Sequence, residues 1–266
     1  MIMTAAPEPA RALRILVTRP AAQATEWVAD LRANGLTTAV ALPLIGIDAV
    51  DDPGELIDAW RALAQHRLVS FVSPNAVQHF FAHRPEGALW PVTVRAGSPG
   101  PGTTRALVDA GVLPTQIVEP AADAAQFDSE SLWAQLRQHN WHGAHVLVVR
   151  GDGGRDWLAD TLRAAGAQVT HVAAYRRCTP RFSAVEQALL HAATAAPAEH
   201  LWLFSSSEAI DNLAALAPAG TAWRDARAVA THPRIVARAR QLGLASVLES
   251  RPSLAAVVAC IQSIRP

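Results

Sequence analysis

Short hydrophobic runs rich in Val, Ile and Leu alternate along this chain with longer stretches in which apolar residues recur at helical spacing. This alternation is typical of parallel sheets covered by helices. The sequence therefore predicts an α/β protein. The predicted strands lie near residues 14–19, 39–49, 68–72, 92–97, 145–150, 168–177, 200–205, 227–231 and 246–249.

The stretches between these strands carry helix signals. Residues 22–34 place Trp27 on an apolar face and stop at Gly35, and residues 155–165 repeat this pattern with Trp157. Apolar helix faces predict core positions for Trp27, Trp60, Trp133 and Trp157. Stretches rich in breakers or in Ala and Pro predict surface loops at 85–91, 114–128 and 192–198.

Elements of the first half return about 130 residues later in the second half. Ile15–Arg19 returns as Val146–Arg150, and Phe71–Val77 returns as Phe204–Ile210. This period is far longer than the roughly 20–50 residues of solenoid repeats. We therefore expect a duplicated α/β unit, with two related lobes and a cleft between them. The equivalent segments 39–50 and 168–180 are longer than the other predicted strands, and we expect them to link the lobes.

Composition narrows the class of protein. Of 266 residues only 17% are charged, and basic and acidic residues balance at 23 each, which argues against a nucleic-acid partner. Two cysteines, Cys178 and Cys260, are too few for a disulfide framework and have no convincing His beside them. Met1–Ala10 lacks the features of a secretion signal, and no run of about eighteen apolar residues occurs. We expect a soluble, cytoplasmic protein without a membrane partner.

Polar and glycine-rich turns follow the predicted strands. In open α/β sheets ligands bind at the carboxyl ends of strands, where exposed backbone N–H groups and helix N-termini attract anions. The pattern therefore predicts an anion-binding cleft. The turns are Ser73–Asn75, Gly100–Thr104, Arg150–Gly154, Ser205–Ser207 and Thr231–Arg234.

Cofactor signatures are missing. Gly100-Pro101-Gly102 lacks a third glycine in register, and no P-loop is present, so we expect no nucleotide cofactor. His139, His142 and His145 stand three apart, but no Asp, Glu or Cys completes a metal set, and we expect no metal.

Tyr175 is the only tyrosine. With a reference pKa of about 10, its phenol can donate a proton at neutral pH. The alternative is a strand tyrosine that only packs.

A series of short motifs runs along the chain: Val17–Pro20, Phe71–Val77, Gly100–Thr103, Asp128–Leu132, Val149–Arg155, Tyr175–Arg177 and Phe204–Ser206. In these motifs the chain resembles the uroporphyrinogen-III synthase family, over residues 13–262. These enzymes close a linear tetrapyrrole while inverting its last ring.

The resemblance implies two similar Rossmann/flavodoxin-like lobes with parallel sheets, joined by a two-stranded β-ladder, with the active cleft between the lobes. Lobe one would be 1–42 plus 179–266, and lobe two 43–178, with linker strands near 39–50 and 168–180. It also implies a small-molecule substrate, hydroxymethylbilane, a linear tetrapyrrole with eight carboxylates, bound mainly by backbone amides and without a cofactor. Tyr175 would assist departure of the terminal hydroxyl. A monomer is expected, and a transient contact with the preceding pathway enzyme is left open.

On this basis the expected substrate-binding residues are Arg19, Ser73, Pro74, Asn75, Gly100, Gly102, Thr103, Arg150, Gly151, Asp152, Ser205, Ser206, Ser207, His232 and Arg234. Two positions depart from the family pattern: Val72 stands where many relatives have threonine, and His232 where glycine commonly precedes the proline. Two other functions are open. One is a two-lobed protein that binds a small anion without catalysis. The other is a nucleotide-sugar transferase, which would need a diphosphate or metal signature that the sequence lacks.

Overall fold

A computed structural model describes residues 13–264 of the chain. Two compact units are present: unit 1 holds the described residues up to Gly46 and those from Thr179 onward, and unit 2 is Ile47–Cys178. The sequence-based interpretation of Met1–Ala10 and the start of the predicted lobe 1–42 fall outside the described residues.

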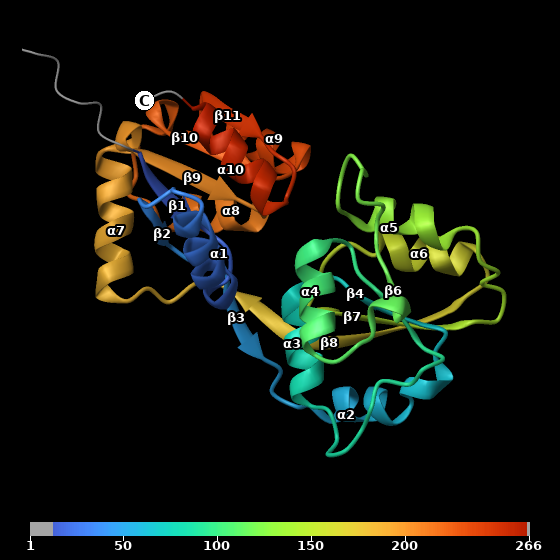
Figure 1. The fold of residues 1–266 in the computed structure, drawn as a ribbon. Coiled ribbons are helices and arrows are strands. Elements are labelled where there is room, and N and C mark those ends of the chain that lie inside the picture. The colour runs from blue at the N-terminus through green and yellow to red at the C-terminus, as the bar shows by residue number, and fades with distance from the viewer. Residues whose placement is uncertain (1–12, 265–266) are drawn as a thin grey trace, which may run out of the picture. The chain divides into compact units, whose positions relative to one another are not determined.

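Unit 1 contains a five-stranded sheet in its described part, in the order β11-β10-β9-β1-β2, with every pairing parallel (Figure 1). Its strands are β1 (Arg14–Val17), β2 (Ala39–Ala41), β9 (His200–Phe204), β10 (Arg227–Ala230) and β11 (Ser246–Glu249). Its helices are α1 (Ala21–Ala33), α7 (Ala184–Ala195), α8 (Ser207–Leu216), α9 (Pro233–Leu242) and α10 (Leu254–Ser263). Short 3₁₀ turns η3 (Pro197–Glu199) and η4 (Trp223–Asp225) precede β9 and β10.

Alternate side chains of these strands fill two core layers, as the two-residue period of a strand requires. Ile15 and Leu203 pack with α1 and α10 on one face of the sheet. Leu16, Trp202 and Phe204 are equally buried on the opposite face. Burial on both faces explains why these strands read as continuous apolar runs.

Unit 2 contains a six-stranded sheet in the order β3-β8-β7-β4-β5-β6 (Figure 1). Its strands are β3 (Gly46–Ala49), β4 (Leu68–Phe71), β5 (Arg95–Gly97), β6 (Ile117–Val118), β7 (His145–Gly151) and β8 (Gln168–Cys178). Its helices are α2 (Gly54–Arg61), α3 (Pro74–Ala82), α4 (Pro101–Asp109), α5 (Ser129–Leu136) and α6 (Trp157–Ala164), with 3₁₀ turns η1 (Leu63–Gln65) and η2 (Pro114–Gln116).

Helices α2, α3 and α4 cover one face of this sheet, and α5 and α6 cover the other. Trp60 of α2 belongs to an aromatic cluster in the first layer. It stacks on Phe80 with ring centroids 4.8 Å apart, and its Nε1 donates a 2.7 Å hydrogen bond to the Phe80 carbonyl. The buried indole N–H is thereby satisfied, as burial of a polar group requires.

The two sheets have the same strand order. Strands β2-β1-β9-β10-β11 of unit 1 correspond to β8-β7-β4-β5-β6 of unit 2, and both follow the flavodoxin-like order 2-1-3-4-5. Each unit combines both halves of the chain, because β1-α1-β2 completes the unit formed by the C-terminal half and β7-α6-β8 completes the other. The chain enters unit 2 through β3 and leaves through β8, and these two strands are neighbours in the sheet. The predicted α/β fold class is confirmed.

Several local predictions were wrong. The predicted strand 39–49 is two strands, β2 and β3, which belong to different sheets. Pro43 lies between them, but it does not end the pairing: Leu42 N–H and Leu44 N–H on either side of it still donate to the carbonyls of Val17 and Thr18, and the chain leaves this sheet after Leu44. Strand β6 lies inside 114–128, which was predicted to be a loop, and α7 continues to Ala195 inside the predicted loop 192–198. Alanine is the best helix former, so the Ala-rich run extends the helix until Pro197.

Trp157 is 37% exposed, whereas Trp60 is 5% exposed, so the prediction of a core position was wrong for Trp157 and is confirmed for Trp60.

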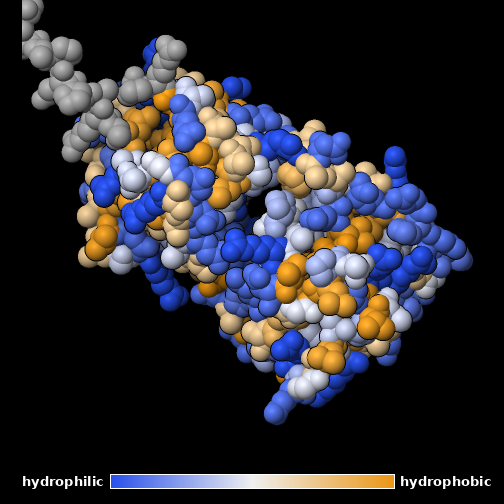
Figure 2. Space-filling view, in the orientation of Figure 1, coloured by the Kyte–Doolittle hydropathy of each residue, from blue (hydrophilic) through white to orange (hydrophobic). Residues whose placement is uncertain are grey.

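The visible face of each unit mixes polar and apolar residues (Figure 2). Among residues 13–264, no helix has the length and apolar character needed to cross a membrane.

Candidate active site

The predicted substrate-binding residues lie at the carboxyl ends of parallel strands, so within each unit they share one edge of the sheet. In unit 2 they follow β4 (Ser73, Pro74, Asn75), follow β5 (Gly100, Gly102, Thr103) and end β7 (Arg150, Gly151, Asp152). In unit 1 they follow β1 (Arg19), β9 (Ser205, Ser206, Ser207) and β10 (His232, Arg234).

Tyr175 reaches this edge of unit 2 through a β-bulge. Arg150 pairs with Ala173 and Gly151 pairs with Tyr175, so Ala174 has no partner in the register. The bulge reverses the normal alternation, and Ala174 and Tyr175 both enter the core layer beneath α3. Without it, Tyr175 would point to the opposite face of the sheet, away from α3.

The phenol of Tyr175 has two polar neighbours. Its oxygen lies 3.0 Å from Ser73 Oγ, and Arg177 Nη2 donates to it at 3.4 Å. The ring is fully buried, and the imidazole of His79 lies 5.7 Å away between ring centroids. Burial, and to a smaller extent the nearby His83, lower the pKa of His79. Ser73 is partly exposed, so it connects the buried phenol to the surface of the unit.

Gly151 makes this arrangement sterically feasible. A Cβ built at Gly151 would lie 2.8 Å from Cε2 and Cζ of Tyr175 and 3.2 Å from its hydroxyl oxygen. Contacts under 3.0 Å are not tolerated, so the tyrosine can approach β7 this closely only beside glycine.

Arg150 holds the turn that follows. Its Nε donates to the Gly153 carbonyl at 3.2 Å, and its guanidinium forms an ion pair with Asp156. The Arg150 side chain is only 13% exposed. The turn is also tied to the bulge, because Asp152 N–H donates to the Tyr175 carbonyl at 2.8 Å. The Arg150 side chain therefore binds to the turn that follows β7 and does not extend into solvent.

His171 lies beside this ion pair. Its Nε2 is 3.5 Å from Asp156 Oδ1, too poorly aligned for a hydrogen bond but close enough for electrostatic attraction. Burial, together with the charges of Arg150 and Arg163, lowers the pKa of His171 against the opposing effect of Asp156. The neutral imidazole is therefore favoured near neutral pH.

Helix N-termini offer places for anions to bind within each unit. Ser73 caps α3 by accepting from Ala76 N–H at 3.2 Å, and α4 begins at Gly100 without a side-chain cap. Helices α1, α3, α4 and α9 have no acidic residue in the first turn. Because carboxylates normally favour that position, α1, α3 and α9 keep partial positive charge for an external anion, whereas in the first turn of α4 the Glu119 carboxylate accepts from Thr104 Oγ1 at 2.6 Å.

Arg19 adds a full charge in unit 1. Its guanidinium carbon lies 4.2 Å from the centroid of the Trp27 ring, and its buried Nε has no hydrogen-bond partner within residues 13–264. Burial lowers the pKa of Arg19 to about 10, which leaves it cationic at neutral pH. A cation with unused donors at a strand end can accept a carboxylate.

Side chains also cap the other unit 1 helices at this edge. Ser206 accepts from Glu208 N–H at 3.2 Å at the start of α8. His232 Nδ1 accepts from Arg234 N–H at 3.1 Å at the start of α9. The imidazole at the position where the family pattern has glycine therefore acts as a helix cap.

His139, His142 and His145 are exposed. Across residues 13–264, no group of three or more His, Cys, Asp or Glu side chains is arranged to hold a metal ion.

The uroporphyrinogen-III synthase HemD family model matches residues 25–259. The chain belongs to the uroporphyrinogen-III synthase family. It is 34% identical over 180 residues to the uroporphyrinogen-III synthase of Salmonella typhimurium, covering 66% of this chain and 70% of that protein. The Escherichia coli enzyme of the same name is 32% identical over 178 residues, with the same coverage. The resemblance inferred from the motifs is confirmed.

Solved structures of the family share the fold. A mutant uroporphyrinogen III synthase from Thermus thermophilus gives a TM-score of 0.57 at 18% identity, covering 94% of this chain and 98% of that one. Uroporphyrinogen-III synthetase from Helicobacter pylori gives 0.58 at 14% identity, covering 95% and 100%.

Sequence reasoning missed two residues of the site. His79 lies against the Tyr175 ring, and Asp156 holds Arg150. Helical spacing from Ser73 could place His79 over the sheet, but nothing in the sequence marks the bulge that brings the tyrosine beneath it. Asp156 could have been found as the acid at the start of α6, a common cap position.

Proposed function

We propose that this protein is a uroporphyrinogen-III synthase, a cyclising hydro-lyase that converts hydroxymethylbilane to uroporphyrinogen III with loss of water. The observation that carries the proposal is membership of that family over residues 25–259. Its chemistry is supported by a sole tyrosine held beside a strand-end turn by a bulge and a glycine. The proposed setting is the cytoplasm, and the proposed state is a monomer.

The reaction begins with departure of the terminal hydroxyl. The C–O bond breaks as the pyrrole nitrogen donates its electron pair, and the hydroxyl leaves as water after taking a proton. The substituted carbon of the last ring attacks the resulting azafulvene, and the spiro intermediate reopens and recloses with that ring inverted. The proton released when the final pyrrole regains aromaticity balances the one consumed at the start.

We assign the first proton to Tyr175, delivered through Ser73. The phenol is fully buried, whereas Ser73 is partly exposed and lies 3.0 Å from it. Ser73 Oγ can pass a proton outward while receiving one from the phenol. The nearby Arg177 guanidinium stabilises the phenolate that is left.

Substrate carboxylates are proposed to bind at the strand-end turns of both units. The supporting features are the N-termini of α1, α3 and α9, which have no acidic residue in the first turn, and the buried Nε of Arg19, which has no hydrogen-bond partner among residues 13–264. Backbone N–H groups do most of this work, so the flexible substrate is positioned by many weak contacts. Arg150 is proposed to hold the turn 151–156 in place through Asp156 and Gly153.

The decisive experiment is incubation with freshly generated hydroxymethylbilane followed by isomer analysis. We expect the type III isomer. Folded protein that yields only the spontaneous type I isomer would refute the enzyme and favour the alternative, a protein that binds a small anion without catalysis.

Tyr175→Phe tests the proton donor, because it keeps the ring and removes only the hydroxyl. Turnover should fall by about 10²-fold or less, the low end for a general acid, because the pyrrole already expels the hydroxyl. Stability should change little and type III should remain the product. Full turnover in folded Tyr175→Phe would make this a packing residue.

Ser73→Ala and the double variant test the relay. If Ser73 and Tyr175 act in series, the double variant should be no slower than either single variant, since groups that act as a unit are not additive. Ser73→Thr, which keeps the hydroxyl and the cap, should retain most activity. Independent, multiplying effects of the two substitutions would show that Tyr175 acts without Ser73.

A further inference from the structure

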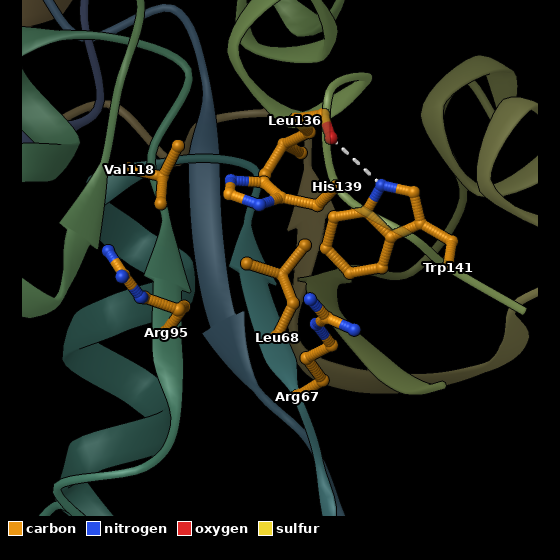
Figure 3. A pocket seen from close by; sticks show the side chains of 7 residues that line it. All are labelled: Arg67, Leu68, Arg95, Val118, Leu136, His139 and Trp141. Atoms are coloured by element: carbon orange, nitrogen blue, oxygen red, sulfur yellow. Dashed lines mark hydrogen bonds between the residues drawn. The ribbon is translucent and has the colours of Figure 1, made fainter. Parts of the chain in front are cut away.

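Unit 2 has a cavity of about 80 Å³ lined by residues of β4, β5 and β6 and of the segment before β7 (Figure 3). Arg67 directly precedes β4, Arg95 begins β5, and Trp141 lies before β7. These positions are the amino ends of parallel strands, whereas the candidate active site is at their carboxyl ends.

The cavity has an apolar lining. Leu68, Val118 and Leu136 contribute aliphatic side chains, and Trp141 forms one wall (Figure 3). The Trp141 indole is 3% exposed and fixed by a 2.9 Å hydrogen bond from its Nε1 to the Leu136 carbonyl. The volume is roughly half of the 150 Å³ cavity that accommodates benzene in another protein, so a short aliphatic chain fits better than a ring.

Positive charge lies at the rim without a balancing acid. None of the lining residues is Asp or Glu. Arg67 donates to the Asn140 carbonyl at 2.7 Å and lies 5.4 Å from the Trp141 ring centroid, which fixes its position. Within residues 13–264, neither Arg67 nor Arg95 has a carboxylate partner, and the guanidinium of Arg95 makes no hydrogen bond. His139 also lines the cavity, on the side of Val118 and Leu136 (Figure 3).

We propose that this cavity binds a small aliphatic monocarboxylate of about three to five carbons. Arg95 pairs with the carboxylate, because a guanidinium with all its donors free can bind a carboxylate through two parallel hydrogen bonds. The alkyl chain packs on Leu68 and Leu136, and Arg67 contributes charge from the opposite side. This site is separate from the proposed catalytic reaction and goes beyond it.

The test is an NMR titration of the full-length protein with butyrate, following the indole N–H of Trp141, whose signal is assigned from the spectrum of Trp141→Phe. Butyramide has the same shape without the charge, and inorganic phosphate has charge without the alkyl chain. We expect saturable butyrate binding with a Kd on the order of 1 mM, well short of the tightest binding that six non-hydrogen atoms allow, because Arg95 is exposed and its pairing with the carboxylate is weakened by solvent. Butyramide and phosphate should bind at least about tenfold more weakly.

Substitutions of single arginines show which guanidinium pairs with the carboxylate. Arg95→Gln should raise the Kd for butyrate about tenfold, and Arg67→Gln a few fold, because only the first removes the paired group. Arg84→Gln, an exposed arginine of the same unit, is the matched control and should not change the Kd. Tyr175→Phe should also bind butyrate normally, which separates this site from the proposed reaction. Equal affinity for butyramide, an unchanged Kd in Arg95→Gln, or a Trp141 signal that stays fixed at ten times the expected Kd would each overturn the proposal.

Discussion

Gly151→Ala should disturb the candidate active site without a direct change to any polar group. The φ angle of Gly151 is not in the left-handed region, so alanine can adopt this backbone without strain. The added methyl group, however, would lie 2.8 Å from two carbons of the Tyr175 ring, whereas carbon atoms normally pack about 3.5–4.0 Å apart. Since the ring is fully buried, it cannot swing into solvent. The ring or β7 must therefore move by roughly 0.7–1 Å.

This displacement sets the expected magnitudes. Overpacking of a core by one methyl group typically costs about 1–3 kcal/mol of unfolding free energy. The same shift would stretch the 3.0 Å contact between Tyr175 and Ser73 beyond good hydrogen-bond geometry. A misplacement of about 1 Å can cost up to 10²-fold in rate. We expect reduced stability and reduced formation of the type III isomer together.

Urea denaturation measures the first effect and isomer analysis the second. Gly102→Ala is the stability control: its Cβ would lie at an ordinary 3.6 Å from Pro74, and alanine favours the helical backbone of α4, so stability should be unchanged or slightly higher. In a Tyr175→Leu background, which removes the ring, Gly151→Ala should cost little. The reasoning would be refuted if Gly151→Ala had the stability and activity of the parent protein. It would also be refuted if Gly151→Ala lowered the unfolding free energy equally with and without the Tyr175 ring.

Three further predictions concern the rest of the molecule. Trp60→Leu should lose about 2–4 kcal/mol of unfolding free energy, because it removes both the stacking on Phe80 and the 2.7 Å hydrogen bond; a loss below about 0.5 kcal/mol in urea denaturation would contradict this. Lowering the pH from about 7 to 5 should reduce stability, because burial lowers the pKa of His66, His79 and His171 in the fold. The unfolded chain then takes up protons near its pKa of about 6.5, before the folded chain does. His79→Gln should flatten this dependence, and stability that rises on acidification would disprove the reasoning. Finally, a chelator should leave the conversion of hydroxymethylbilane unchanged, since the reaction as proposed needs no metal; activity that is lost and then restored by zinc would argue otherwise.

The sequence allowed the fold class and the strand-end turns to be predicted because both depend on local patterns. Apolar runs buried on two faces mark parallel strands, and the Ser and Gly residues after them mark the turns. An unbroken apolar run is a weaker guide to where one strand ends and the next begins. Residues 39–49 look like one strand in hydrophobicity, yet β2 pairs with β1 in one sheet and β3 pairs with β8 in the other.

The orientation of Tyr175 could not be predicted. Strict alternation assigns it the opposite face from Ala174, and the bulge that reverses this comes from the register between β7 and β8. Register depends on the whole sheet rather than on residues near position 175 in sequence. The ion pair between Arg150 and Asp156 could not be predicted either. It depends on the path of the turn 151–156, which has positive φ angles at Gly153 and Gly154.

The exchange of β1-α1-β2 between the two halves of the chain sets an order in which the protein can be completed during synthesis. Unit 2 is contained in Ile47–Cys178, so all its strands exist once residue 178 has left the ribosome. Strand β1, in contrast, pairs with β9, where Arg14 lies opposite His200. Strand β1 must therefore wait, with one edge unpaired, until residues 200–204 have been made. Nascent chains stalled shortly after unit 2 emerges should contain one protease-resistant unit and a cleavable segment around β1 and α1, and aggregation during synthesis would begin at the unpaired edge of β1.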